Sequence, residues 1–169
     1  MSKQGRLTAF DHIVAGSRAI LQAVPEERMD WRPHEKSWTL GQLATHLTNV
    51  PNWTMATLST SEFDISPADG SDPPPLTALA TTAELVDALD AGAAAARAAI
   101  EGISDEDIAG PWTMLVAGEP RFTLTKSVVL RTFIMDHMIH HRAQLGVYLR
   151  MLDVPVPQVF GPTADFPDM

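Results

Sequence analysis

The sequence contains no cysteine among its 169 residues. Thiolate side chains are therefore excluded as nucleophiles and as ligands, which removes cysteine hydrolases, zinc ribbons and iron–sulfur proteins from consideration. Disulfide bonds are excluded as well, so the fold must be held by a hydrophobic core. A chain of this length, with 45% hydrophobic and 20% charged residues, is long enough to bury one.

Positive charge is also scarce. Twelve lysine and arginine residues are outnumbered by 21 aspartate and glutamate residues, which gives a formal net charge of −9. Binding to the phosphates of nucleic acids depends on clustered basic side chains, and the sequence shows no such cluster. We therefore expect no nucleic-acid partner, and we interpret the acidity as a source of solubility.

Long hydrophobic runs are missing too. Residues 1–24 are polar and interrupted by charges, so they do not resemble a signal peptide or a membrane span. The sequence predicts a cytoplasmic protein with no membrane partner.

Several common catalytic motifs are absent from the sequence. There is no glycine-rich phosphate-binding loop and no G-x-S-x-G nucleophile turn. No glutamate lies three residues before a histidine, which excludes the Glu-x-x-His ligands of ferritin-like di-iron proteins. The stretch "HMIHH" (137–141) also lacks the glutamate of the H-E-x-x-H metalloprotease helix. Any chemistry would have to come from a bound ion.

Four segments show the apolar spacing of amphipathic helices: 5–24, 39–53, 81–100 and 126–152. Thr39 with Gln42, and Thr81 with Glu84, form capping boxes at the starts of two of them. We expect Pro51 to kink the second helix rather than end it. The economical fold is an all-α, up-and-down four-helix bundle that forms a single domain over residues 1–169.

The connections between these helices differ in character. Residues 59–78 hold four prolines and are predicted to form a long loop. Two short extended runs around Gly118-Glu119-Pro120 predict a small β-hairpin between the third and fourth helices. Ser104 is expected to cap a single helical turn before this hairpin, and the proline-rich tail after Leu152 is expected to be irregular.

Two histidines on the last helix replace the apolar residues of an ordinary core helix. Its inner face is predicted to carry Phe133, His137, His141, Gln144 or Leu145, Tyr148 and Leu152. Side chains four residues apart lie one above the other on a helix, and two imidazoles at that spacing can bind one ion. His46 lies on the inner face of the second helix and is the candidate third ligand. The sequence predicts a metal site formed by His46, His137 and His141.

The other polar residues near this pattern have weaker assignments. His140 is about 100° away from His137 around the helix, so it is expected on the surface or behind the ligands. His12 is expected to be half-exposed and His34 solvated in a loop. Asn49 and Trp53 could line a pocket or serve packing and the helix end, and Gln144 could orient a water.

Two stretches make the chain resemble the DinB/YfiT-like family of metal-dependent enzymes. "KSWTLGQLATHLTNVPNW" is similar to the family's second helix, and "DHMIHHRAQLGVYLRML" followed by "VPVPQVFGPTAD" is similar to its last helix and tail. The resemblance covers nearly the whole chain and implies a four-helix bundle with a three-histidine site. It places the metal ligands at His46, His137 and His141, the residues that helix geometry also selects.

The resemblance further implies nickel, zinc or a similar divalent ion, with the remaining positions held by water. Some relatives are thiol-dependent transferases or isomerases that bind a low-molecular-weight thiol, and many are homodimers. The chain departs from the family in one place, where Phe166 follows Asp165 and the family tail often continues acidic. The leading hypothesis is an ion that activates a thiol or a water toward a small-molecule substrate, by transfer, isomerisation or hydrolysis.

Two other functions fit the same residues. In the first, the metal is structural and the protein is a non-catalytic, metal-stabilised dimeric binding module. In the second, there is no metal and the histidines sense pH at an interface, since an unperturbed imidazole titrates near pH 6.5. A single histidine on an apolar face is usually a hydrogen-bonded core residue, so the metal hypothesis depends on all three histidines lying together.

Overall fold

The computed structural model describes residues 2–71 and 76–168, and helices make up most of this part of the chain. The α-helices are α1 (Lys3–Gln22), α2 (Leu40–Asn49), α3 (Trp53–Ser59), α4 (Thr82–Gly102), α5 (Asp105–Ala109), α6 (Lys126–Val129) and α7 (Asp136–Met151). Short 3-10 helices span Glu26–Arg28 and Val50–Asn52, and a π-helix spans Leu130–Met135. None of the helices in these two ranges combines the length and hydropathy that crossing a membrane requires.

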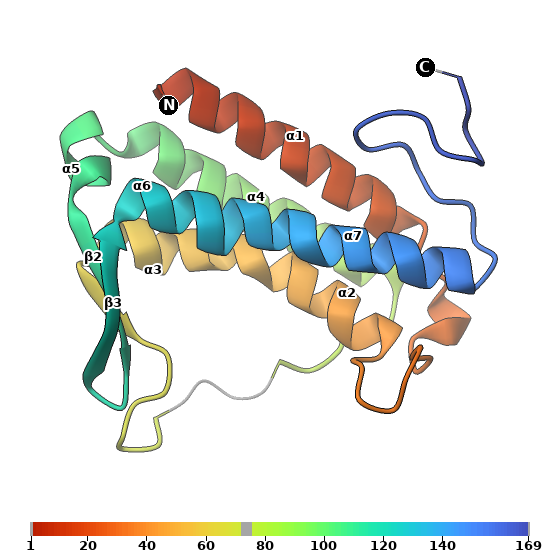
Figure 1. Ribbon diagram of the computed structural model, residues 1–169, viewed down its shortest axis with the longest axis horizontal. Coiled ribbons are helices and arrows are strands. Elements are labelled where there is room, and N and C mark those ends of the chain that lie inside the picture. The colour runs from red at the N-terminus through yellow and green to blue at the C-terminus, as the bar shows by residue number, and fades with distance from the viewer. Residues whose placement is uncertain (1, 72–75, 169) are drawn as a thin grey trace.

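The long helices lie side by side, with a small sheet at one end of them (Figure 1). Helices α1 and α2 each pack against both α4 and α7. The core between them is apolar and excludes solvent; its largest fully buried side chains include Phe10, Leu21, Leu47, Leu89 and Met138. Because α2 packs directly on α7, the two histidine-bearing helices are neighbours.

The second helical segment bends at Pro51, as predicted. Helix α2 ends at Asn49, a 3-10 turn spans Val50–Asn52, and α3 continues from Trp53. Proline lacks the N–H that an α-helical turn requires, which explains the tighter turn. Gly92 of α4 also matters here, since a β-carbon on this residue would lie 2.7 Å from Oδ1 of Asn52. The small residues of α4 therefore allow close packing against the bend.

The last helical segment is continuous from Lys126 to Met151 but contains a π-helical stretch, Leu130–Met135. The N–H of Asp136 bonds to the carbonyl of Arg131, five residues earlier. A π-turn holds more residues than an α-turn, so it rotates the preceding residues away from the face that follows. The prediction that Phe133 shares the inner face with His137 is therefore wrong. Phe133 is 40% exposed and stacks on Phe122, with the ring centroids 4.9 Å apart.

The sheet contains three strands, β1 (Glu62–Asp64), β2 (Pro111–Val116) and β3 (Glu119–Thr125), in the order β1-β2-β3. Strands β2 and β3 form the predicted hairpin, with positive φ angles at Ala117 and Gly118 in its turn. Strand β1 pairs parallel with β2 and corrects the prediction that 59–78 is entirely loop. The Asp64 carboxylate accepts a 2.7 Å hydrogen bond from the N–H of Gly118, so β1 is held by the hairpin turn. Residues 72–75 of the predicted loop lie outside the described residues.

A capping box fixes the start of α2, the helix that carries His46. Thr39 Oγ1 accepts a 3.2 Å hydrogen bond from the N–H of Gln42, and the N–H of Thr39 donates to Oε1 of Gln42 at 2.9 Å. This capping box, predicted from the sequence, satisfies backbone donors at the beginning of the helix that carries His46.

We expect the Thr39→Ala substitution to lower the free energy of unfolding by about 1 kcal/mol, because it removes this cap. Thr39→Ser keeps the hydroxyl and should retain most of the stability. Urea denaturation followed by circular dichroism measures both. Equal stability of the alanine and wild-type proteins would show that the capping box does not stabilise α2.

Candidate metal centre

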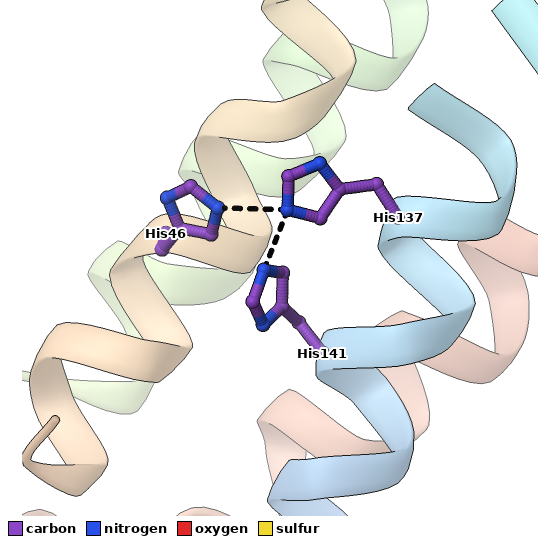
Figure 2. A group of neighbouring side chains, drawn as sticks. All are labelled: His46, His137 and His141. Carbon is purple, nitrogen blue, oxygen red and sulfur yellow. Dashed lines mark hydrogen bonds between the residues drawn. The ribbon is translucent and has the colours of Figure 1, made fainter. Parts of the chain in front are cut away.

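The structure brings His46 of α2 together with His137 and His141 of α7 (Figure 2). Nε2 of His46 lies 3.3 Å from Nε2 of His137, and Nε2 of His137 lies 2.6 Å from Nε2 of His141. The side chain of His141 is buried, whereas those of His46 and His137 are half-buried. All three rings therefore point one nitrogen at a common position between the two helices.

A hydrogen bond on the outer side of His141 determines which of its nitrogens carries the proton. Nδ1 of His141 lies 2.7 Å from the side-chain oxygen of Gln144, and an amide oxygen only accepts, so Nδ1 is the donor. The backbone of Phe133 acts on His137 in the opposite direction to burial and raises the pKa of its ring.

A neutral imidazole carries one proton, so Nε2 of His141 presents a lone pair. This lone pair faces Nε2 of His137 across 2.6 Å, so a proton or a cation can lie between the two rings. His141 is arranged in the way that histidine ligands of metals usually are, with its second nitrogen donating to an oxygen.

The electrostatic environment keeps the three rings neutral. Burial, together with the nearby His141 and His137, lowers the pKa of His46 to about 4. Burial also lowers the pKa of His137 and of His141, although the bonds to Phe133 and Gln144 oppose this effect. Metal ligation requires the unprotonated ring, so these shifts keep the cluster in its ligating form near neutral pH.

The donor set fits a divalent transition-metal ion. Imidazole nitrogens bind zinc and nickel well, and zinc–nitrogen distances are about 2.0–2.1 Å. At that distance two nitrogens of one ion are separated by about 3–3.4 Å, which matches the 3.3 Å between His46 and His137. The 2.6 Å between His137 and His141 is shorter and would have to widen around an ion. The ligand nitrogens of the three residues all lie within 4.8 Å of one another, so they could hold a single metal ion.

Two tryptophans flank the histidines. The ring centroid of Trp53 lies 5.6 Å from His46 and 5.1 Å from His137. The ring of Trp38 lies 4.9 Å from His46 and 5.8 Å from His141. The sequence analysis selected Trp53 but missed Trp38. The available signal was its position directly before the helix cap Thr39, where an apolar residue often packs back onto the helix.

The other three histidines lie outside the cluster. His140 is exposed, with its ring 4.9 Å from that of His141, so it lies outside the cluster as predicted. His34 is exposed in a loop, also as predicted. His12 is exposed rather than half-exposed, and its ring contacts Phe160.

The two polar residues of the prediction both make contacts at helix positions. Asn49 accepts a 3.1 Å hydrogen bond from Asn52, which is the helix-end role among the alternatives. The side-chain oxygen of Gln144 bonds to Nδ1 of His141, so its amide orients this ring.

The lowered pKa values predict how the metal-free protein responds to pH. An unfolded chain protonates these histidines near pH 6.5, whereas the folded His46 resists protonation until about pH 4. The unfolded state therefore binds more protons in this window, so the free energy of unfolding falls as the pH falls from about 7 to 5. His46→Gln should show a shallower decrease than the wild type. Thermal denaturation in chelator measures the slopes, and equal slopes for His46→Gln and wild type would contradict the shift.

Comparisons with known proteins agree with this architecture. The family model of the DinB superfamily matches residues 9–145, a range that contains all three histidines. No curated protein matches the chain.

Two solved structures share the fold. A DinB-like protein from Bacillus cereus ATCC 10987 superimposes with a TM-score of 0.71 at 19% identity, over 93% of this chain and 97% of that one. A DinB-like protein from Bacillus subtilis, YjoA, gives a TM-score of 0.69 at 16% identity, over 92% of this chain and 97% of the other. The family match covers most of the sequence, and the chain belongs to the DinB superfamily.

Proposed function

We propose that this protein is a divalent-metal-dependent enzyme whose ion is held by His46, His137 and His141. The observation that carries the proposal is the convergence of three imidazole nitrogens, which all lie within 4.8 Å of one another, with Nδ1 of His141 already engaged by Gln144. Nickel and zinc are the ions we favour, because both accept an all-imidazole ligand set. The frame of the site would be the up-and-down arrangement of four helical segments within one domain.

A bound ion would supply a Lewis acid that lowers the pKa of a coordinated thiol or water toward neutrality. The chain's own residues determine how strong this effect can be. Three neutral imidazoles contribute no negative charge. Asp136, next to His137 in sequence, forms an ion pair with Arg131 at 2.8 Å, so its carboxylate is engaged elsewhere. A ligand set without carboxylates leaves the positive charge of the site undiminished.

The tryptophans would shape the space beside the ion. Trp38 and Trp53 contact the histidines from two sides, and Trp38 is itself 47% exposed. Indole rings next to a polar centre exclude water and offer flat apolar surface to a small substrate. Such surroundings favour a small substrate with an apolar part, and the resemblance to the DinB/YfiT-like family adds a low-molecular-weight thiol. We propose a thiol-dependent transfer or isomerisation, or a hydrolysis, on this basis.

Metal content tests the proposal first. Protein purified without a histidine tag and dialysed against nickel or zinc should retain one ion per chain. His137→Ala and His46→Ala should retain less than about a tenth of an ion, because too few ligands remain. His140→Ala is the matched control from the same helix and should bind as the wild type does. Full stoichiometry in the two ligand variants would contradict the site.

Turnover tests the enzymatic part separately. Metal-loaded protein should consume a low-molecular-weight thiol in the presence of an electrophile, or hydrolyse a small substrate, and His137→Ala should not. Stabilisation by metal without any turnover would instead favour the metal-stabilised binding module. Sedimentation velocity measures the oligomeric state, which we expect to be a homodimer.

Gln144 should affect metal affinity without being a ligand. Its side-chain oxygen accepts from Nδ1 of His141, which fixes the ring with Nε2 toward the cluster. Loss of such a bond typically costs about 10–100-fold in metal affinity. We therefore expect this loss in Gln144→Ala and partial retention in Gln144→Glu, whose carboxylate can still accept. Calorimetric titration with zinc measures both affinities, and an unchanged affinity in Gln144→Ala would show that the bond does not orient His141.

A further inference from the structure

A large groove lies away from the histidines. It has a volume of about 820 Å³ and lies between the outer side of α7 and the C-terminal segment. Its floor on α7 includes Ala143, Gly146 and Val147, and its wall on the C-terminal segment includes Val156 and Phe160. The histidine cluster uses other positions of α7. The two features therefore occupy different faces of the same helix.

The C-terminal wall of this groove is fixed by polar contacts. Nη1 of Arg150 donates to the carboxylate of Asp165 at 3.1 Å, and that carboxylate also accepts from the N–H of Val156 at 2.8 Å. The hydroxyl of Thr163 donates to the carbonyl of Val156 at 2.9 Å. These bonds hold the segment against α7 without a helix or strand. They also pair Arg150, one of the two arginines that line the groove, with a carboxylate.

The other arginine of the groove, Arg142, is buried, and no carboxylate of the described residues pairs with it. The residue is only 3% exposed. Among the described residues it forms no ion pair, and one hydrogen bond is found, from Nη1 to the carbonyl of Ile13 at 3.2 Å. Phe160 lies against the guanidinium, with the ring centroid 4.8 Å from its central carbon. Burial without a counter-ion lowers the pKa of this arginine.

The backbone of α1 makes room for this charge. A β-carbon on Gly16 would lie 2.6 Å from Nη1 of Arg142, so any larger residue would collide with the guanidinium. Burying an unpaired charge is costly, because the group loses its hydration and gains no opposite charge in return. An anion reaching the guanidinium from the groove would offset that cost.

We propose that this groove binds a small monocarboxylate with an apolar chain, its carboxylate directed to Arg142 and its chain lying along α7. One unneutralised cation selects a singly charged ligand, because Arg150 is already paired with Asp165. The apolar surface of the groove favours a ligand with an apolar chain. Val147 is 58% exposed and Met151 is 55% exposed, and both line the groove. The site is independent of the metal centre.

Calorimetric titration of decanoate into chelator-treated protein tests the proposal, since the chelator removes metal as a competing carboxylate ligand. We expect one decanoate per chain. Decyltrimethylammonium and 1-decanol, which carry the same chain with the opposite charge or none, should bind at least about tenfold more weakly, because a charge-assisted bond contributes at least that much.

Two variants place the ligand in the groove. Arg142→Met keeps the apolar stem of the side chain. It should weaken the binding of decanoate at least about tenfold and leave the affinity for 1-decanol unchanged. Arg97→Met, a substitution on the exposed side of α4, is the matched control. Gly146→Leu should abolish binding by filling the groove. A β-carbon there would meet Val156 at an ordinary 3.8 Å, and leucine favours the helix, so this variant should fold.

The outcomes separate clearly. Equal affinities for decanoate and 1-decanol, unchanged binding in Gly146→Leu, or no decanoate binding at all would each overturn the proposal. Self-association that buries the groove and is unaffected by decanoate would also overturn it, by assigning this face to a second copy of the chain. Metal content is measured in the same variants and should stay at the wild-type value, so a failure here leaves the metal centre unaffected.

Discussion

The convergence of three imidazole nitrogens on one position is the constraint on which this account depends. Nε2 of His137 lies 2.6 Å from Nε2 of His141 and 3.3 Å from Nε2 of His46, and Nδ1 of His141 donates to Gln144 on the outer side. A core that needed only to be stable would place leucine at these positions. The arrangement makes physical sense when a cation is bound, because the cation uses all three inward nitrogens.

The rest of the fold serves to keep these nitrogens together. Helix α2 packs on α7, its capping box at Thr39 fixes where it begins, and the bend at Pro51 places Trp53 beside His46 and His137. The π-helical stretch before Asp136 rotates Phe133 out of the inner face toward the hairpin. The opposite side of α7 remains available for the groove at Arg142. One helix thus contributes to two sites of different chemistry.

The sequence was most informative where a periodic pattern had a single physical interpretation. The helices, both capping boxes, the bend at Pro51 and the hairpin follow from spacing and from turn chemistry, and the structure confirms them. The i, i+4 histidines and His46 were placed together correctly. What the pattern could not reveal depends on contacts distant in sequence. Strand β1 exists because β2 offers a partner, and Trp38 reaches the histidines through the fold.

The most direct test of the central claim is X-ray absorption spectroscopy of the nickel- or zinc-loaded protein. The account predicts three imidazole nitrogens bound to a single ion at about 2.0–2.1 Å, with the remaining scatterers being light oxygen atoms of solvent. A spectrum that requires fewer than three imidazoles, or that fits oxygen ligands alone, would contradict the convergence of His46, His137 and His141 on one ion.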